Sequence, residues 1–156
     1  MIDQKTLTTP FVGPNSVRLV RGFAALMGVL ILLQAFLAGR GIYVDLGLFR
    51  THRFVGMATL LIALIQVGVV TASLRRSRER SMLIGMSSFV LLLTVIQLGL
   101  GFSGKNNGGV AAWHVFNGVL LTGAIAAYAN TVFRLETAPR IEPIESQSEA
   151  REGGSR

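Results

Sequence analysis

The chain has no cysteine among its 156 residues, and this absence excludes several kinds of site at once. Disulfides, thiolate metal centres, covalently attached c-type haem and cysteine nucleophiles all require a thiol. Charged residues are scarce as well, at 15% of the chain, whereas hydrophobic residues make up 51% and the mean hydropathy is +0.55. Because a soluble domain normally has about 25% charged residues, this composition predicts a membrane protein.

Four apolar stretches are long enough to cross a bilayer as helices, which takes about 20 residues. They cover residues 17–39, 53–74, 81–102 and 109–133. The second helix is expected to begin a turn or two before its apolar run, near Asp45, because aspartate is a favoured N-cap. The continuous apolar runs differ from the alternating pattern of a membrane barrel. The predicted fold is therefore all-α, a transmembrane four-helix bundle of up-down-up-down topology.

The two ends of the chain differ from this apolar centre. Residues 1–16 contain prolines and a glycine without a helical period, and residues 134–156 mix Pro, Ser, Gly, Glu and Arg. Such compositions are typical of flexible or disordered segments. We therefore expect a flexible N-terminal segment over 1–16, a transmembrane domain over 17–133 and a disordered cytoplasmic tail over 134–156. The first apolar stretch has the flanking residues of a signal peptide, but its length indicates a retained helix.

The chain has only two histidines, and both stand in the same five-residue pattern, His-x-Phe-x-Gly. The pattern runs from His52 to Gly56 and again from His114 to Gly118, each time near the start of an apolar stretch. A fixed offset between matching motifs is the mark of an internal repeat. The four helices are therefore predicted to form two copies of one helical hairpin.

A glutamine within the preceding apolar stretch extends this repeat. Gln34 lies 18 residues before His52, and Gln97 lies 17 residues before His114. Polar side chains inside a membrane need partners. We expect the two glutamines to bond a histidine Nδ1, a haem carboxylate or each other, and interhelical hydrogen bonding without a cofactor is the alternative.

Basic residues outnumber acidic ones by 15 to 8, and they are unevenly distributed between the two sides of the predicted bundle. Nine fall near one membrane face: Lys5, Arg18, Arg21, Arg75, Arg76, Arg78, Arg80, Arg134 and Arg140. Four fall near the other: Arg40, Arg50, Arg53 and Lys105. The positive-inside rule then places both termini in the cytoplasm and the histidine-proximal loops outside. We predict a multi-pass protein of the cell inner (plasma) membrane whose net charge of +7 requires no nucleic acid partner.

The predicted topology brings the two histidines to the same depth near the outer face. The second and fourth helices run in the same direction as diagonal neighbours, and each histidine lies in the first two turns of its helix. With adjacent axes 8 to 10 Å apart the diagonal is roughly 11 to 14 Å, which leaves room for imidazole, iron and imidazole in line. We therefore predict one haem b per chain, with His52 and His114 as the iron ligands. A structural hydrogen-bonding role and another metal or proton-transfer role are the alternatives.

The neighbouring residues are interpreted in the same way. Gly56 and Gly118 each lie four positions after a histidine on the same helix face, where they would let a flat macrocycle approach the backbone; helix packing is the other interpretation. Arg50 and Arg53 flank His52 and could pair with haem carboxylates, or could simply extend to the interface.

The chain resembles one four-helix half of heme A synthase. The resemblance rests on the His-Arg pair at the start of the second predicted helix, on the second histidine at the start of the fourth, and on the repeat of helical hairpins. The arrangement is also similar to that of small bacterial four-helix membrane proteins of the bis-histidine, b-type cytochrome kind. The resemblance covers roughly residues 17–133 and implies that His52 and His114 bind haem. Heme A synthase has a glutamate where this chain has Phe49, and many members have a cysteine pair that this chain lacks. The resemblance therefore implies the scaffold and the ligands more than the synthase activity.

Two axial imidazoles leave no open iron position, so electron transfer is the expected chemistry. The expected partners are the lipid bilayer and a quinone, an extracytoplasmic redox protein or a larger membrane redox complex. A haem-free accessory or assembly subunit, and a haem- or quinone-modifying enzyme, are the alternatives.

Overall fold

The computed structural model describes residues 13–74, 79–104 and 107–135. This part of the chain forms four helices: α1 (Pro14–Tyr43), α2 (Leu48–Ser73), α3 (Arg80–Ser103) and α4 (Gly108–Phe133). All four are long and apolar enough to cross a membrane. The prediction of an all-helical protein with four candidate spans is confirmed. The flexibility predicted for 1–16 and the disorder predicted for 134–156 fall largely on 1–12 and 136–156, which lie outside the described residues. Leu135, inside the predicted tail, is instead buried in the hydrophobic core.

Two helix boundaries differ from those expected. Helix α1 begins at Pro14, inside the segment expected to be flexible, because proline fits the first position of a helix, where no backbone N–H donor is needed. Helix α2 has Gly47 at its N-cap, so the prediction that Asp45 caps it is wrong. Instead Asp45 Oδ1 accepts a hydrogen bond from the Gly47 backbone N–H at 2.8 Å and closes the turn that precedes the helix.

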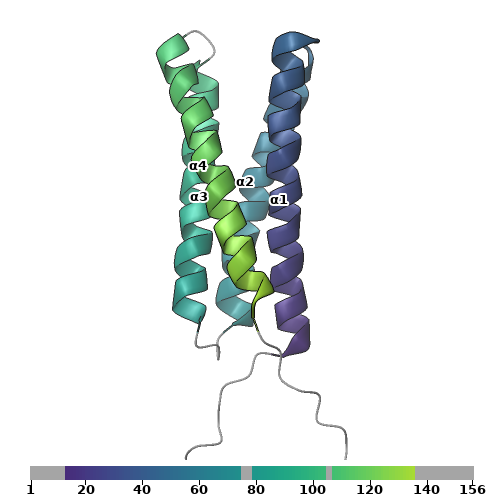
Figure 1. The fold of residues 1–156 in the computed structure, drawn as a ribbon, viewed down its shortest axis with the longest axis vertical. Coiled ribbons are helices and arrows are strands. Elements are labelled where there is room, and N and C mark those ends of the chain that lie inside the picture. The colour runs from purple at the N-terminus through teal and green to yellow at the C-terminus, as the bar shows by residue number, and fades with distance from the viewer. Residues whose placement is uncertain (1–12, 75–78, 105–106, 136–156) are drawn as a thin grey trace, which may run out of the picture.

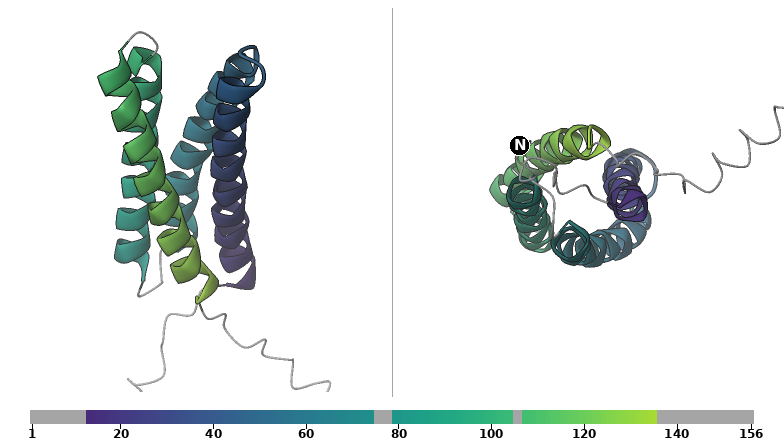
Figure 2. Two further views of the ribbon diagram at one scale, coloured as in Figure 1. Left: turned by 45° about the horizontal axis from the view of Figure 1, so that its top comes forward. Right: turned by 90° about the horizontal axis from the view of Figure 1, so that it is seen from below.

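The four helices stand around a ring in chain order (Figure 2). Each helix packs against the next one along the chain, and α1 packs against α4. Within the described residues, no Cα atom of α2 comes within 8 Å of a Cα atom of α4. Helices α2 and α4 are therefore diagonal neighbours. The Pro14 end of α1 and the Phe133 end of α4 lie at the same end of the bundle (Figure 1).

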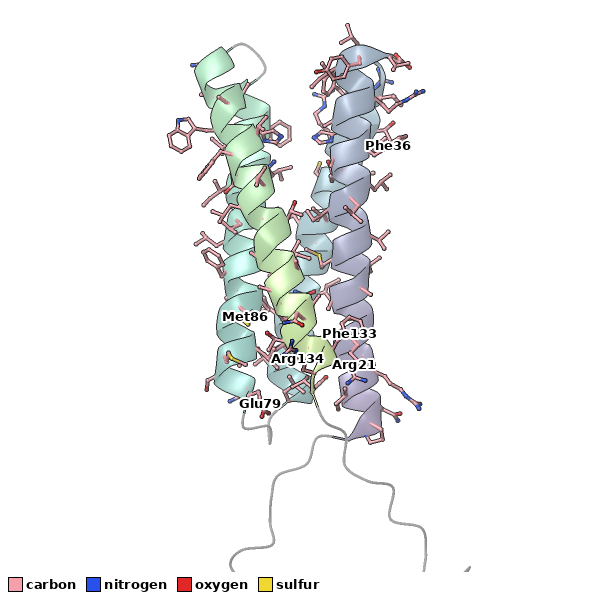
Figure 3. All side chains as sticks on the ribbon, in the orientation of Figure 1. Arg21, Phe36, Glu79, Met86, Phe133 and Arg134 are labelled. Carbon is pink, nitrogen blue, oxygen red and sulfur yellow. The ribbon has the colours of Figure 1, made fainter. Side chains whose placement is uncertain are left out.

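Arg21 connects the first and last helices at this end. Its guanidinium donates to the carbonyl oxygens of Val132 at 3.5 Å, Phe133 at 3.1 Å and Leu135 at 2.7 Å, and it lies 6.0 Å from the centre of the Phe133 ring. Figure 3 shows Arg21 and Phe133 together there. Because the last carbonyls of a helix have no partner within it, Arg21 acts as a cap that α1 supplies to α4.

The hydrophobic core is concentrated in the half of the bundle that contains these ends. It consists mainly of Val17, Val20, Ala24, Met27 and Ile31 of α1, Ala63, Val70 and Leu74 of the α2 region, Leu83, Val90 and Leu93 of α3, and Leu121, Ile125, Tyr128, Val132 and Leu135 of the α4 region. The α1–α2 pair and the α3–α4 pair converge at this end and diverge toward the other (Figures 1 and 2). The buried stripes of α2 and α4 continue upward to the two histidines, where they become only partly buried.

Candidate functional site between the two histidines

The imidazole rings of His52 and His114 meet in the diverging half of the bundle. Their centres are 6.3 Å apart and their planes are inclined by 75°. His52 comes from α2 and His114 from α4, the diagonal helices without a close backbone approach. The two rings therefore span the interior between the hairpins, and both are partly buried.

A main-chain carbonyl of the neighbouring helix holds each ring. His52 Nδ1 lies 3.1 Å from the carbonyl oxygen of Gln34, and His114 Nδ1 lies 3.0 Å from that of Gln97. A carbonyl oxygen can only accept, so Nδ1 carries the proton and donates in both rings. Each neutral imidazole then has its lone pair on Nε2, the usual arrangement of a metal-binding histidine whose other nitrogen is fixed by a carbonyl.

The separation of the rings fits two ligands of one metal. With metal–nitrogen bonds of about 2.0 Å and a ring radius of roughly 1.1 Å, two axial imidazoles have ring centres about 6 Å apart. The observed 6.3 Å matches this spacing. No group of three or more His, Cys, Asp and Glu side chains able to hold a metal ion occurs among the described residues.

The side chains of the two glutamines differ in their partners. The Gln34 amide nitrogen donates to the main-chain carbonyl of His52 at 2.9 Å. The Gln97 amide nitrogen lies 3.3 Å from Nε2 of His114, which can only accept because Nδ1 has the proton. A histidine Nδ1 was one of the partners expected for each glutamine side chain, beside a haem carboxylate and the other glutamine. In the structure the main-chain carbonyl oxygen of each glutamine, and not its side chain, contacts the Nδ1 atom.

Asn117, which lies one turn after His114 on α4, is a further polar residue of the site. It is not among the cofactor-binding residues predicted from the sequence. It is 6% exposed and donates from Nδ2 to the carbonyl oxygen of Leu93 at 3.0 Å and to Oε1 of Gln97 at 2.7 Å. Its position three residues after His114 on the same helix face is the sequence signal that indicates an inward side chain.

The two glycines of the repeated pattern lie against the glutamine amides. A Cβ atom at Gly56 would lie 3.4 Å from Gln34 Nε2, and one at Gly118 would lie 3.1 Å from Gln97 Nε2. The contact that the structure gives these glycines is thus with a glutamine side chain of the neighbouring helix. A place for a macrocycle at the same glycines stays a prediction.

Gly101 of α3 is a further residue of the site that sequence reasoning missed. A Cβ atom there would lie 3.0 Å from Cε1 and 3.3 Å from Nδ1 of His114. Its spacing of four residues from Gln97, which equals the spacing of the pattern glycines from the histidines, is the only sequence signal for it. On the other hairpin, Phe49 contacts the His52 ring edge-on, with 6.5 Å between ring centres.

The two arginines proposed to meet haem carboxylates, Arg50 and Arg53, are exposed in the structure. They occupy faces of α2 other than the one that directs His52 inward. Tyr43 and Trp113, which are 86% and 64% exposed, lie near the same end of the bundle, as residues anchored at a membrane interface would.

No protein-family model, curated protein or solved structure matches the chain.

Proposed function

We propose that the chain is a b-type cytochrome in which His52 and His114 bind the iron of one haem b from opposite sides. The observation that carries this proposal is the meeting of the two imidazoles across the bundle diagonal at 6.3 Å. In each ring Nδ1 donates to a main-chain carbonyl, which leaves the lone pair on Nε2. Both histidines are only partly buried, in contrast to the buried apolar core nearer the other end of the bundle, and this difference supports a cofactor site between them.

A bound haem b would supply one-electron transfer at its iron. The residues of the chain would hold the two imidazoles in place and surround them with helices. Because both histidines would be used to hold the haem, the proposed role is electron transfer to or from a quinone, an extracytoplasmic redox protein or a larger membrane redox complex.

The same proposal includes the topology and the location. The matched bonds of Gln34 to His52 and of Gln97 to His114 support an up-down-up-down bundle of two repeated hairpins. The asymmetry of the basic residues supports cytoplasmic termini in the inner membrane, with the histidine layer near the outer face.

Replacing each histidine tests the proposal. His52→Ala and His114→Ala should each remove a low-spin absorption spectrum or convert it to a five-coordinate high-spin one, while the bundle still inserts because its apolar segments are unchanged. Thr51→Ala, at an exposed neighbour of His52, is the matched control and should retain the wild-type spectrum. If both histidine variants keep that spectrum, the ligand assignment is wrong.

One observation favours a second function, that of a haem-free accessory subunit. The Gln97 amide already donates to Nε2 of His114, and the pattern glycines accommodate the glutamines. In that case the histidines serve as interhelical hydrogen-bonding groups. Wild-type protein that is stable and lacks haem after expression with ample haem would support this second function.

A further inference from the structure

The two hairpins differ at one polar position beside the histidines. Asn117 follows His114 by three residues, and the residue that follows His52 by three is Val55. In the second hairpin Asn117 bonds Gln97, whereas a valine has no polar group for Gln34. This single difference accompanies the different directions of the two glutamine amides.

The hydrogen bonds around Asn117 have one consistent direction. The carbonyl of Leu93 can only accept, so the asparagine group that faces it is the NH2, and the same NH2 donates to Gln97 Oε1. With its oxygen held by Asn117, Gln97 turns its own NH2 toward Nε2 of His114. Gln34 has no such neighbour and donates to the His52 carbonyl instead. Among the described residues, no hydrogen bond reaches Nε2 of His52.

We infer that Asn117, acting through Gln97, makes His114 the exchangeable member of the histidine pair and His52 the permanent one. The inference rests on the proposed haem site. To bind a metal, Nε2 of His114 must give up the hydrogen bond from the Gln97 amide. When His114 leaves the metal, the same hydrogen bond can form again and stabilise the unbound histidine. Release of His114 from a bound haem would leave its place open to a small diatomic ligand, so the site would bind a gas as well as carry electrons.

The test exchanges the two residues that distinguish the hairpins. Asn117→Val gives the second hairpin the residue of the first, and Val55→Asn does the reverse. Carbon monoxide is mixed with the full-length reduced haem protein in detergent, and its binding rate is measured. This rate is limited by the release of a histidine from the iron. Asn117→Val should slow binding by about fivefold, since a net hydrogen bond changes an equilibrium by this order, and Val55→Asn should accelerate it. Thr122→Val, which loses only a bond to the carbonyl of Gly118 on its own helix, should leave the rate unchanged.

A second measurement needs no haem. In the apoprotein, the ¹⁵N chemical shift of His114 Nε2 should report an accepted hydrogen bond that Asn117→Val removes, while the shift of His52 Nε2 should not change. An unchanged His114 shift in Asn117→Val would overturn the inference even if the protein binds haem.

The outcomes separate the inference from the proposed function. Haem-loaded protein that binds no carbon monoxide, or that binds it at the same rate in both exchanged variants, overturns the inference and leaves the cytochrome standing. Wild-type protein without haem overturns both. Opposite changes of rate in the two variants would support the inference, because a general loss of stability would not slow one variant and accelerate the other.

Discussion

At the scale of single residues, the repeated pattern has a structural reason that does not involve a cofactor. The histidine is held by a main-chain carbonyl, and the glycine leaves space for the amide of the glutamine on the neighbouring helix. The feature that distinguishes a haem site from helix packing is the close approach of the two imidazole rings, whose centres are 6.3 Å apart. Nε2 of His114 already has a hydrogen-bond partner in the Gln97 amide.

Gly101 provides a residue-scale test of how closely the His114 ring must be placed. Gly101→Ala would put a methyl group 3.0 Å from Cε1 of His114 and force the ring to move, and overpacking of this kind costs about 1 to 3 kcal/mol. Haem occupancy, measured as the haem-to-protein ratio after purification, should fall severalfold. Gly99→Ala is the matched control two residues earlier, because a Cβ atom there meets nothing within 4 Å. Equal occupancy in the two variants would show that the ring tolerates displacement.

Part of the site could be predicted from the sequence. The pattern His-x-Phe-x-Gly, which occurs twice, identifies the two histidines, and the similar spacings of 18 and 17 residues pair each histidine with its glutamine. The repeat does not identify Gly101 or the role of Asn117, since both depend on how α3 and α4 are rotated against each other. It also does not specify that the main-chain oxygen of the glutamine, and not its amide, binds the imidazole.

At the scale of the helices, hydropathy locates the spans but not their ends. Helix α1 extends from Pro14 to Tyr43, three residues earlier and four later than the apolar stretch 17–39. Backbone hydrogen bonding continues past the last apolar residue wherever no strong helix breaker intervenes. Gly41 is compatible with this extension because its face packs on the Phe49 ring, which a Cβ atom would approach to 3.2 Å.

Arg21 provides the prediction at this scale. Arg21→Ala removes the bonds to three carbonyls at the end of α4, and hydrogen bonds from a charged group contribute about 1 to 3 kcal/mol. The free energy of unfolding in detergent should fall by about this amount. Arg18→Ala, which removes an exposed arginine one turn earlier on α1, should change it by less than about 0.5 kcal/mol. Equal losses would mean that general charge at this end, and not the cap, stabilises the contact between α1 and α4.

At the scale of the whole molecule, the α1–α2 and α3–α4 pairs converge at one end of the bundle and diverge toward the other. The fully buried apolar side chains gather where the ends of α1 and α4 meet, and the histidine layer is only partly buried. Apolar length and the repeat predict four helices in two hairpins. They do not predict that the two hairpins converge at one end and diverge at the other, because this depends on how the helices pack in three dimensions.

The orientation of the molecule in the membrane is the prediction at this scale. The positive-inside rule applied to the basic residues places both termini in the cytoplasm. A topology reporter fused after Ser77 should be cytoplasmic, and one fused after Asn106 should be external. The reverse pattern would move the histidine layer to the cytoplasmic face and exclude an extracytoplasmic redox partner.

The central claim is that one haem lies between His52 and His114. It is tested most directly by the haem content and the oxidised and reduced absorption spectra of the full-length wild-type protein, purified in detergent from cells with ample haem. The account predicts one haem b per chain with a six-coordinate, low-spin spectrum in both oxidation states. Protein that is folded and free of haem, or whose haem is entirely high-spin, would contradict it.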